Sequence, residues 1–591
     1  MLNVDQQWVE LLDDGRQHLE EFDTSDDQGD LGKLMLNVFA DLNSGKHNNH
    51  SCQSCNKGLT YMKLFVPFPS ILKLLAHVVC PIIESMFTSR VCSGILDRIA
   101  DPMVYVLQNT NLTVPEVCAA LLHPDCMTHL GLPLTRYVHW ELPLPKRRRF
   151  KPRYPRNKKR QLKMLHLTDV HLDLCYAPGS ASHCREPLCC RPSSPPLTSR
   201  SSAGNHSAGY WAETRFSCDA RLEFVAAAIK HMADRHRDLD FIIWTGDNAP
   251  HDVWNTTRES NLRHILEVTR IVKRAFRGKP VFPTLGNHDT HPNNMYVPNK
   301  AALDSNGDVS MSWLYDTLAD NYWHQWLSAP EAKRTFKLGG YYTARMGKGL
   351  VAIVLNNNIC HLGNVWIAYD PIDPDGQLQW LIDQLDSAER RGLYAIIIGH
   401  VPIEECYMSW TNNYLRIVER YAQVIVGAYF GHSHKDEIAV YYSKNSSDNS
   451  VYPVSHGYIG SSLTTFPSLN PGYRIFTLDS TGVPIDFTMY YTNVTESNLA
   501  GDGRPPKWLF GYSAKKSYKM KSLSTRSWDR FMTKAATDDR LADLYFKHYR
   551  RFSEAFIEDK GQRYYDIHRK RRTLLSRRVV NPAHLLLPNP H

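Results

Sequence analysis

The chain has 591 residues, of which 42% are hydrophobic and 11% aromatic, and its formal net charge is +9 at pH 7. This composition excludes a largely disordered chain, and the length allows several domains. The most apolar stretch, residues 65–87, is interrupted by prolines and charged side chains, so we expect no membrane-spanning helix. Residues 1–20 are acidic and lack the apolar segment of a signal peptide.

Cysteines and glycosylation sequons indicate the compartment. The chain has 13 cysteines, all between Cys52 and Cys406. N-x-S/T sequons begin at Asn49, Asn111, Asn205, Asn255, Asn445 and Asn493. Clustered cysteines beside several sequons are typical of the secretory pathway, so we predict a glycosylated, disulfide-bonded protein that is secreted, lysosomal or both. The alternative is a cytosolic protein with reduced thiols and chance sequons.

Composition shifts along the chain predict five segments. They are a polar N-terminal extension (1–47), a cysteine-rich helical module (48–130), a Pro-rich basic linker (131–161), a catalytic domain (162–498) and a helical, basic C-terminal region (499–591). Apolar strands alternate with helical stretches in the fourth segment, which is typical of an α/β fold. The linker's basic run, which starts at Lys146, is either a solvated tether or a contact for an anionic surface. We do not expect nucleic-acid binding.

Metal-ligand residue types follow five apolar stretches. The motifs MLHLTDVH, FIIWTGDNAPHD, PVFPTLGNHD, YAIIIGHVP and VIVGAYFGHSH contain Asp169, His171, Asp247, His251, Asn287, His288, His400, His432 and His434. Ligands gather beyond the carboxyl ends of strands in open α/β sheets, and the glycines in four of these motifs permit close backbone approach. Imidazole and carboxylate suit Zn, Mn or Fe better than Ca. The sequence therefore predicts a metal centre.

The order of these motifs resembles the calcineurin-like metallophosphoesterases over residues 163–495. That resemblance implies two mixed β-sheets, sandwiched and flanked by helices. It also implies one metal on Asp169, His171, Asp247 and His434, and another on Asp247, Asn287, His400 and His432. Two such metals activate a hydroxide that attacks the phosphorus. His288 is the candidate proton donor to the leaving oxygen, and His251 is the candidate for phosphate stabilisation or shared acid duty.

The first six cysteines resemble a saposin-type domain, an all-α, lipid-handling fold. Their spacing alone does not choose among the pairings. The resemblance implies the nested pairs Cys52–Cys126, Cys55–Cys118 and Cys80–Cys92. The apolar stretches between them are either simply core or faces that open onto lipid.

The order of the two modules, with LTDVHLD, PLCC, GDNAPHDVW and GNHD, resembles the acid sphingomyelinase family over about residues 50–560. The resemblance implies zinc-dependent hydrolysis of sphingomyelin to ceramide and phosphocholine. It also implies the pairs Cys184–Cys189, Cys190–Cys218 and Cys360–Cys406, which leave Cys175 unpaired. This chain departs from better-known members because no cysteine follows Cys406. We expect a monomer that meets sphingomyelin in membranes, with its basic segments on anionic lipid.

Two alternatives remain open. The chain could act on nucleotides or other soluble phosphoesters, although such substrates do not need a saposin-type module. It could also be a lipid-binding protein without catalysis, which the complete ligand set argues against.

Overall fold

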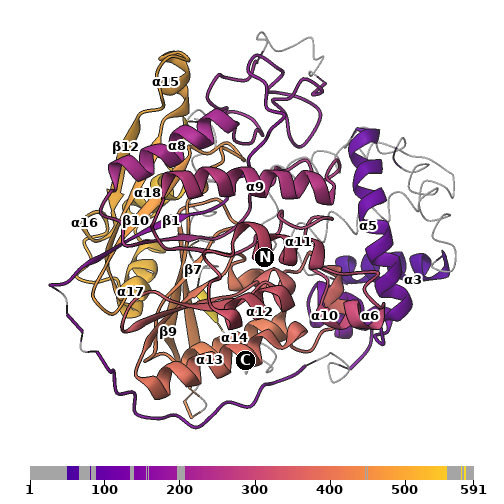
Figure 1. Cartoon of the computed structure of the whole chain (residues 1–591). Helices are drawn as coiled ribbons and strands as arrows, with labels where there is room; N and C mark the ends of the chain where they lie inside the picture. The colour runs from indigo at the N-terminus through magenta and orange to yellow at the C-terminus, as the bar shows by residue number, and fades with distance from the viewer. Residues whose placement is uncertain are drawn as a thin grey trace.

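The computed structural model describes residues 49–65, 80, 88–133, 139–154, 156–157, 159–195, 206–445, 447–448, 450–554, 574 and 578–580 (Figure 1). The predicted N-terminal extension (1–47) and the sequon at Asn205 lie outside these residues. No helix among the described residues is long and apolar enough to cross a membrane.

The cysteine-rich module is helical where it is described. Its helices are α3 (Asn49–Phe65), α5 (Ser89–Asn109), α6 (Val114–Leu121) and α7 (Asp125–His129). Thr88 caps α5 by accepting the N–H of Val91, and a capping box of Thr113 and Glu116 begins α6. The disulfides Cys52–Cys126, Cys55–Cys118 and Cys80–Cys92 are the pairs that the saposin-type resemblance implies. That the module is a saposin-type domain stays a prediction.

Two mixed β-sheets form the centre of the molecule, which confirms the predicted fold class. The first has the strand order β12-β11-β10-β1-β2-β3, and the second the order β13-β8-β9-β7-β6-β5-β4. The first sheet contains β1 (Leu162–Leu167), β2 (Phe241–Trp244), β3 (Val281–Pro283), β10 (Gly472–Leu478), β11 (Pro484–Thr492) and β12 (Trp508–Ser513). The second contains β4 (Tyr342–Arg345), β5 (Leu350–Val354), β6 (Tyr394–Ile398), β7 (Ile425–Phe430), β8 (Glu437–Lys444), β9 (Val451–Ile459) and β13 (Arg578–Val580).

Side-chain alternation along the strands explains the layers. In β6, Ile396 and Ile398 belong to the core between the sheets, whereas Ala395 and Ile397 pack on the opposite face. Helices α8 (Leu222–Arg235) and α9 (Arg258–Ala275) cover the outer face of the first sheet (Figure 1). Helices α13 (Gln377–Arg391) and α14 (Met408–Arg420) cover the outer face of the second.

Shorter elements connect these layers. The short α-helices are α10 (Asn299–Asp304), α11 (Ser312–Thr317), α12 (Pro330–Gly339) and α15 (Val494–Leu499). Single turns are η2 (Leu318–Tyr322), η3 (Asn357–Cys360), η4 (Val365–Ala368), η5 (Pro374–Gly376) and η6 (Ile403–Glu405).

The C-terminal region contains the helices that were predicted and also two strands. It contributes α16 (Ala514–Ser517), α17 (Thr525–Ala535) and α18 (Asp539–Tyr549), but also β12 and β13. Strand β12 pairs antiparallel with β11 and β13 pairs parallel with β8, so both sheets continue past residue 498. Aromatic residues in β12 supply the strand signal, which the strong basic charge of the region obscured.

The basic linker lies against the second sheet's helices where it is described. The side-chain amide of Asn413 in α14 donates to the carbonyl of Trp140 and its oxygen accepts the N–H of Leu142, each over 2.8 Å. Arg148 forms an ion pair with Asp386 at 2.7 Å. Much of this segment is therefore docked rather than a free tether, although Lys146, Arg147 and Arg149 stay exposed.

Trp528 tests whether the C-terminal region belongs to the central core. Its side chain is fully buried in α17, and its ring stacks at 6.4 Å from that of Phe487 in β11. We expect Trp528→Ala to lower the free energy of unfolding by about 3–5 kcal/mol, because a large cavity would remain. Denaturant unfolding followed by fluorescence measures the change. Lys534→Ala, at an exposed position of the same helix, is the control and should change little.

Candidate active site at the strand ends

Five strand ends carry the predicted ligands to one place. Asp169 and His171 follow β1, Asp247 follows β2, Asn287 follows β3, His400 follows β6, and His432 and His434 follow β7. Five of these residues have positive φ angles, namely Asp169, His171, Asp247, His432 and His434. Such backbone conformations are uncommon outside glycine and concentrate at functional sites. Gly286 and Gly431 are needed here, because a Cβ at either position would collide with the side chain of Asp247 or Asp169.

The first ligand group places two imidazole lone pairs face to face. Nδ1 of His171 lies 2.8 Å from the carbonyl oxygen of Ala249, and Nδ1 of His434 lies 2.7 Å from that of Phe466. Each Nδ1 must donate, so in a neutral ring each Nε2 carries a lone pair. The two Nε2 atoms are 3.0 Å apart, and that of His434 is 3.5 Å from Oδ1 of Asp169. Two neutral rings would repel each other here, so this pair of nitrogens favours a shared proton or a metal ion between them.

The second ligand group also has an imidazole held through its Nδ1, and it surrounds Asp247. Nδ1 of His400 donates to the carbonyl of Thr245 over 2.6 Å, so its Nε2 faces Oδ1 of Asn287 at 2.9 Å. That Asn287 oxygen is also 2.7 Å from Nδ1 of His432. Oδ2 of Asp247 is buried without a hydrogen-bond partner, 3.1 Å from Nε2 of His400 and 3.4 Å from Nε2 of His171. An orphaned carboxylate oxygen between two groups fits a bridging ligand, so the residues present fit two metal ions.

Electrostatics show how strongly the site attracts positive charge. Burial alone would lower the pKa of His171 and His400, but the buried Asp247 carboxylate raises both to about 9. The pKa of Asp247 itself is held well below its usual range, despite its burial, by His400 and His288. The site therefore requires cations at its centre, supplied either by protons or by metal ions.

The predicted catalytic histidines lie beside the first ligand group. The ring of His251 stacks between His171, at 4.0 Å, and Phe466, at 3.8 Å, and the ring of His288 is 4.6 Å from that of His251. The backbone N–H of His288 donates to Oδ1 of Asp247 over 2.8 Å. Burial lowers the pKa of both histidines well below the ordinary value.

Asp219 orients His251, and the sequence analysis did not find it. Its carboxylate, which is fully buried, lies 2.8 Å from Nδ1 of His251 and also accepts the backbone N–H of that residue over 2.7 Å. The Nε2 atom of His251 is therefore the one available to a substrate. Asp219 lies in a loop outside the five motifs, and its only local signal is the neighbouring Cys218.

Arg191 is a second residue that the motifs did not indicate. Its buried guanidinium donates to Asp173 over 2.7 and 2.9 Å and to Asp252 over 2.5 Å. Asp173 and Asp252 are neighbours of His171 and His251 in the chain. The disulfide Cys190–Cys218 directly precedes both Arg191 and Asp219 and ties their two loops together. The Cys184–Cys189 and Cys360–Cys406 disulfides are also present, and Cys175 is free and exposed.

The C-terminal region braces the loop that carries His432 and His434. Arg551, which follows α18 and is fully buried, donates to the carbonyl of His434 and to that of Asn470, and its other nitrogen donates to Oγ of Ser462 over 2.9 Å. Burial lowers the pKa of this guanidinium to about 9. Sequence reasoning gave the C-terminal region no part in the site.

Comparison with known proteins points to the same chemistry as the geometry of the site. Residues 162–436 match the family model of calcineurin-like phosphoesterases. The chain is 34% identical to the sphingomyelin phosphodiesterase of Bos taurus over 464 residues, which are 77% of this chain and 71% of that protein. The chain belongs to the sphingomyelin phosphodiesterase family. The human family member is also 34% identical, over 77% of this chain and 70% of its own length. Sphingomyelin phosphodiesterase B of Dictyostelium discoideum is 29% identical over 85% of this chain and 76% of its own length.

Family membership and the phosphoesterase domain make the chain a phosphodiester hydrolase. The range matched by the family model starts at the first residue of β1. The fold extends beyond the matched range, because β8 to β13 all follow residue 436.

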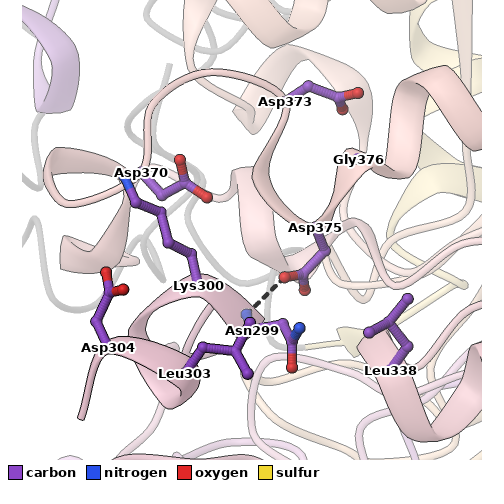
Figure 2. Close-up of a pocket in the computed structure, with 9 residues that line it drawn as sticks. All are labelled: Asn299, Lys300, Leu303, Asp304, Leu338, Asp370, Asp373, Asp375 and Gly376. Atoms are coloured by element: carbon purple, nitrogen blue, oxygen red, sulfur yellow. Dashed lines mark hydrogen bonds between the residues drawn. The ribbon is translucent and has the colours of Figure 1, made fainter.

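A separate cavity of about 330 Å³ lies between α10, α12 and η5. Figure 2 shows carboxylates of Asp304, Asp370 and Asp375 near Lys300, with the backbone N–H of Asn299 donating to Asp375 over 2.6 Å. Burial raises the pKa of Asp375 to about 7. No predicted ligand or catalytic residue lines this cavity, so it is not the catalytic site.

The described sequons differ in access. Asn111 and Asn255 are exposed, whereas Asn445 and Asn493 are half-buried. The side-chain oxygen of Asn493 accepts the N–H of Glu496, and its amide lies 3.2 Å from Glu554. Glycosylation at these positions stays a prediction.

Asp219→Asn tests the orientation of His251. The amide can donate a proton to Nδ1, so the ring would lose its fixed tautomer. We expect phosphodiester turnover to fall about 10- to 100-fold, which is the usual loss when a supporting carboxylate is changed. Metal content measured by mass spectrometry should not change. Asp234→Asn, at an exposed position of α8, is the matched control. Unchanged turnover in Asp219→Asn would contradict the assigned role.

Proposed function

We propose that the chain hydrolyses sphingomyelin to ceramide and phosphocholine at a centre that holds two divalent metal ions, with zinc as the metal. The observation that carries the metal centre is the facing pair of Nε2 lone pairs on His171 and His434, beside the orphaned oxygen of Asp247. The substrate is supported by the relatives, which are named sphingomyelin phosphodiesterases. Imidazole, carboxylate and amide ligands suit zinc.

The ligands divide as the family resemblance implies. Asp169, His171 and His434 would hold one ion, Asn287, His400 and His432 the other, and Oδ2 of Asp247 would contact both. When bound, two such ions activate water as a nucleophile and offset charge on the phosphoryl oxygens. The protein keeps each ligand ring in one orientation through its second nitrogen, so little reorganisation is needed.

His288 and His251 would act on the substrate. His288 is half-buried and lies next to Asn287 in the chain, so its ring can reach the leaving oxygen of a bound phosphodiester. Burial lowers the pKa of the ring, and the negative charge of a bound phosphodiester would raise that pKa again, so that His288 can give the leaving oxygen a proton. Asp219 holds His251 with Nε2 free, which suits a hydrogen bond to a phosphoryl oxygen. The distance of 4.6 Å between the two rings allows both to contact one substrate.

The N-terminal module would present the lipid. Helix α5 packs directly on the catalytic domain, where Val91 joins a buried cluster with Leu188, Trp254 and Phe466. Arg90 of the same helix makes hydrogen bonds to both carboxylate oxygens of Glu186. Because Phe466 stacks on His251, this contact places the module beside the site. We further propose a secreted or lysosomal monomer that holds anionic lipid through its exposed basic residues.

His288→Ala tests the proton donor. We expect sphingomyelin turnover to fall by about 10²- to 10⁴-fold, the usual contribution of general acid catalysis. A p-nitrophenyl phosphodiester, whose leaving group needs no proton, should lose much less. Comparing kcat for the two substrates measures the difference. Equal losses on both substrates would show that His288 is not the acid.

Turnover of sphingomyelin vesicles compared with turnover of a nucleoside triphosphate tests whether the chain acts on a membrane lipid or on soluble phosphoesters. We expect metal-loaded protein to turn over the vesicles faster, measured as phosphocholine release. Asp247→Ala should abolish turnover but leave vesicle binding intact, because the bridging carboxylate lies far inside the catalytic domain. If metal-loaded protein hydrolyses no phosphodiester, the result would favour the alternative of a lipid-binding protein without catalysis.

Salt tests the contact with anionic lipid. Vesicle sedimentation should show weaker binding to anionic vesicles as the salt concentration rises, since exposed charges are screened. Replacing Arg147 and Arg149 with Glu should weaken this binding, at about 1 kcal/mol for each charge removed near the surface. Neutral vesicles are the control. Binding to anionic vesicles that does not respond to salt would contradict the proposal.

A further inference from the structure

His432 is supported differently from the other ligand histidines. His171, His400 and His434 each direct the second ring nitrogen to a backbone carbonyl, those of Ala249, Thr245 and Phe466. His432 instead places Nε2 at 2.9 Å from a carboxylate oxygen of Glu405. A carboxylate is charged, whereas the carbonyls are not, so the four imidazoles are not electronically equivalent.

Glu405 is held firmly enough to have this effect. Its side chain is 2% exposed, and the residue ends the turn η6. Cys406, the next residue, forms the disulfide with Cys360 and pairs through its backbone with His361. Glu405 is therefore fixed by a covalent link between two segments, directly behind His432.

We propose that Glu405 is a positioning residue that makes the two metal positions unequal. Accepting the Nε2 proton of His432 fixes that ring with its Nδ1 lone pair toward Oδ1 of Asn287, 2.7 Å away. Negative charge on this acceptor strengthens the imidazole as an electron-pair donor to a metal ion. The ion held by Asn287, His400 and His432 then binds more tightly than it would with a neutral acceptor behind His432. This inference rests on the proposed two-metal site.

A direct ligand role for Glu405 fits the geometry less well. Ligand atoms of His361, Glu405 and His432 lie within 4.8 Å of one another, which could suggest a third metal ion. However, Nδ1 of His361 accepts the N–H of Gly363 over 3.2 Å. In the neutral ring the proton is then on Nε2, which has no lone pair for a metal. His361 is kept neutral, because burial and the neighbouring His432 lower its pKa to about 3.

Metal titration of Glu405→Gln tests the proposal. Glutamine keeps the shape and an oxygen acceptor but removes the charge. Metal-free protein is titrated with Zn²⁺ against a chromophoric chelator. We expect two binding events in the unchanged protein, and a 10- to 100-fold loss of affinity at one of them in the variant. Glu404→Gln, which removes the neighbouring charge, is the matched control and should leave both events unchanged.

Double variants identify the affected ion. The loss caused by Glu405→Gln should be non-additive with that of Asn287→Ala and additive with that of His171→Ala. Glu405→Asp, which keeps the charge, should retain more affinity and serves if the glutamine variant fails to fold. Unchanged affinities, or equal losses at both positions, would overturn the proposal. A third Zn²⁺ that the variant loses would instead make Glu405 a ligand. If the unchanged protein binds no Zn²⁺, this result would contradict the proposed two-metal function itself, and not only the role of Glu405.

Discussion

The concentration of ligand atoms around Oδ2 of Asp247 is the constraint on which the rest of the structure depends. Nε2 of His171 and Nε2 of His434 are 3.0 Å apart, and Oδ2 of Asp247 is buried nearby without a hydrogen-bond partner. Burying such groups costs several kcal/mol unless a cation compensates. The surrounding structure must therefore be stable enough to hold them together before the cation arrives.

Several distant parts of the chain supply that stability. Five strands from both sheets end at the site, and positive φ angles at five ligands show that the backbone is forced into place there. Arg551 braces the loop after β7 from the C-terminal side, and Arg191 braces the loops after β1 and β2. Both guanidiniums are buried, so each places a positive charge near the acidic residues of the site in addition to its hydrogen bonds.

The predictable part of the site is the part that local sequence encodes. The candidate ligands and both candidate catalytic histidines follow apolar strands in short motifs, and the structure brings all of them together. Asp219, Arg191 and Glu405 could not be found in this way, because each acts across loops and no fixed spacing links it to its partner. Cysteines adjoin all three, at Cys218, Cys190 and Cys406, so disulfide positions are the one sequence signal they share. Similarly, the prediction of a helical C-terminal region did not include β12, whose aromatic strand signal lies in a strongly basic stretch and whose partner, β11, is set by tertiary pairing.

The N-terminal module contacts the catalytic domain beside the candidate site. Trp254 lies three residues after His251, and Phe466 both stacks on His251 and accepts the Nδ1 proton of His434. Val91 of α5 packs on this pair from the N-terminal module, and a Cβ at Gly94 would collide with Trp254, so the helix approaches closely. A shift of α5 would change the packing of Phe466, whose carbonyl orients the candidate ligand His434 and whose ring stacks on the proposed phosphate-binding histidine, His251. The position of the module and the geometry of the site are therefore linked through Phe466.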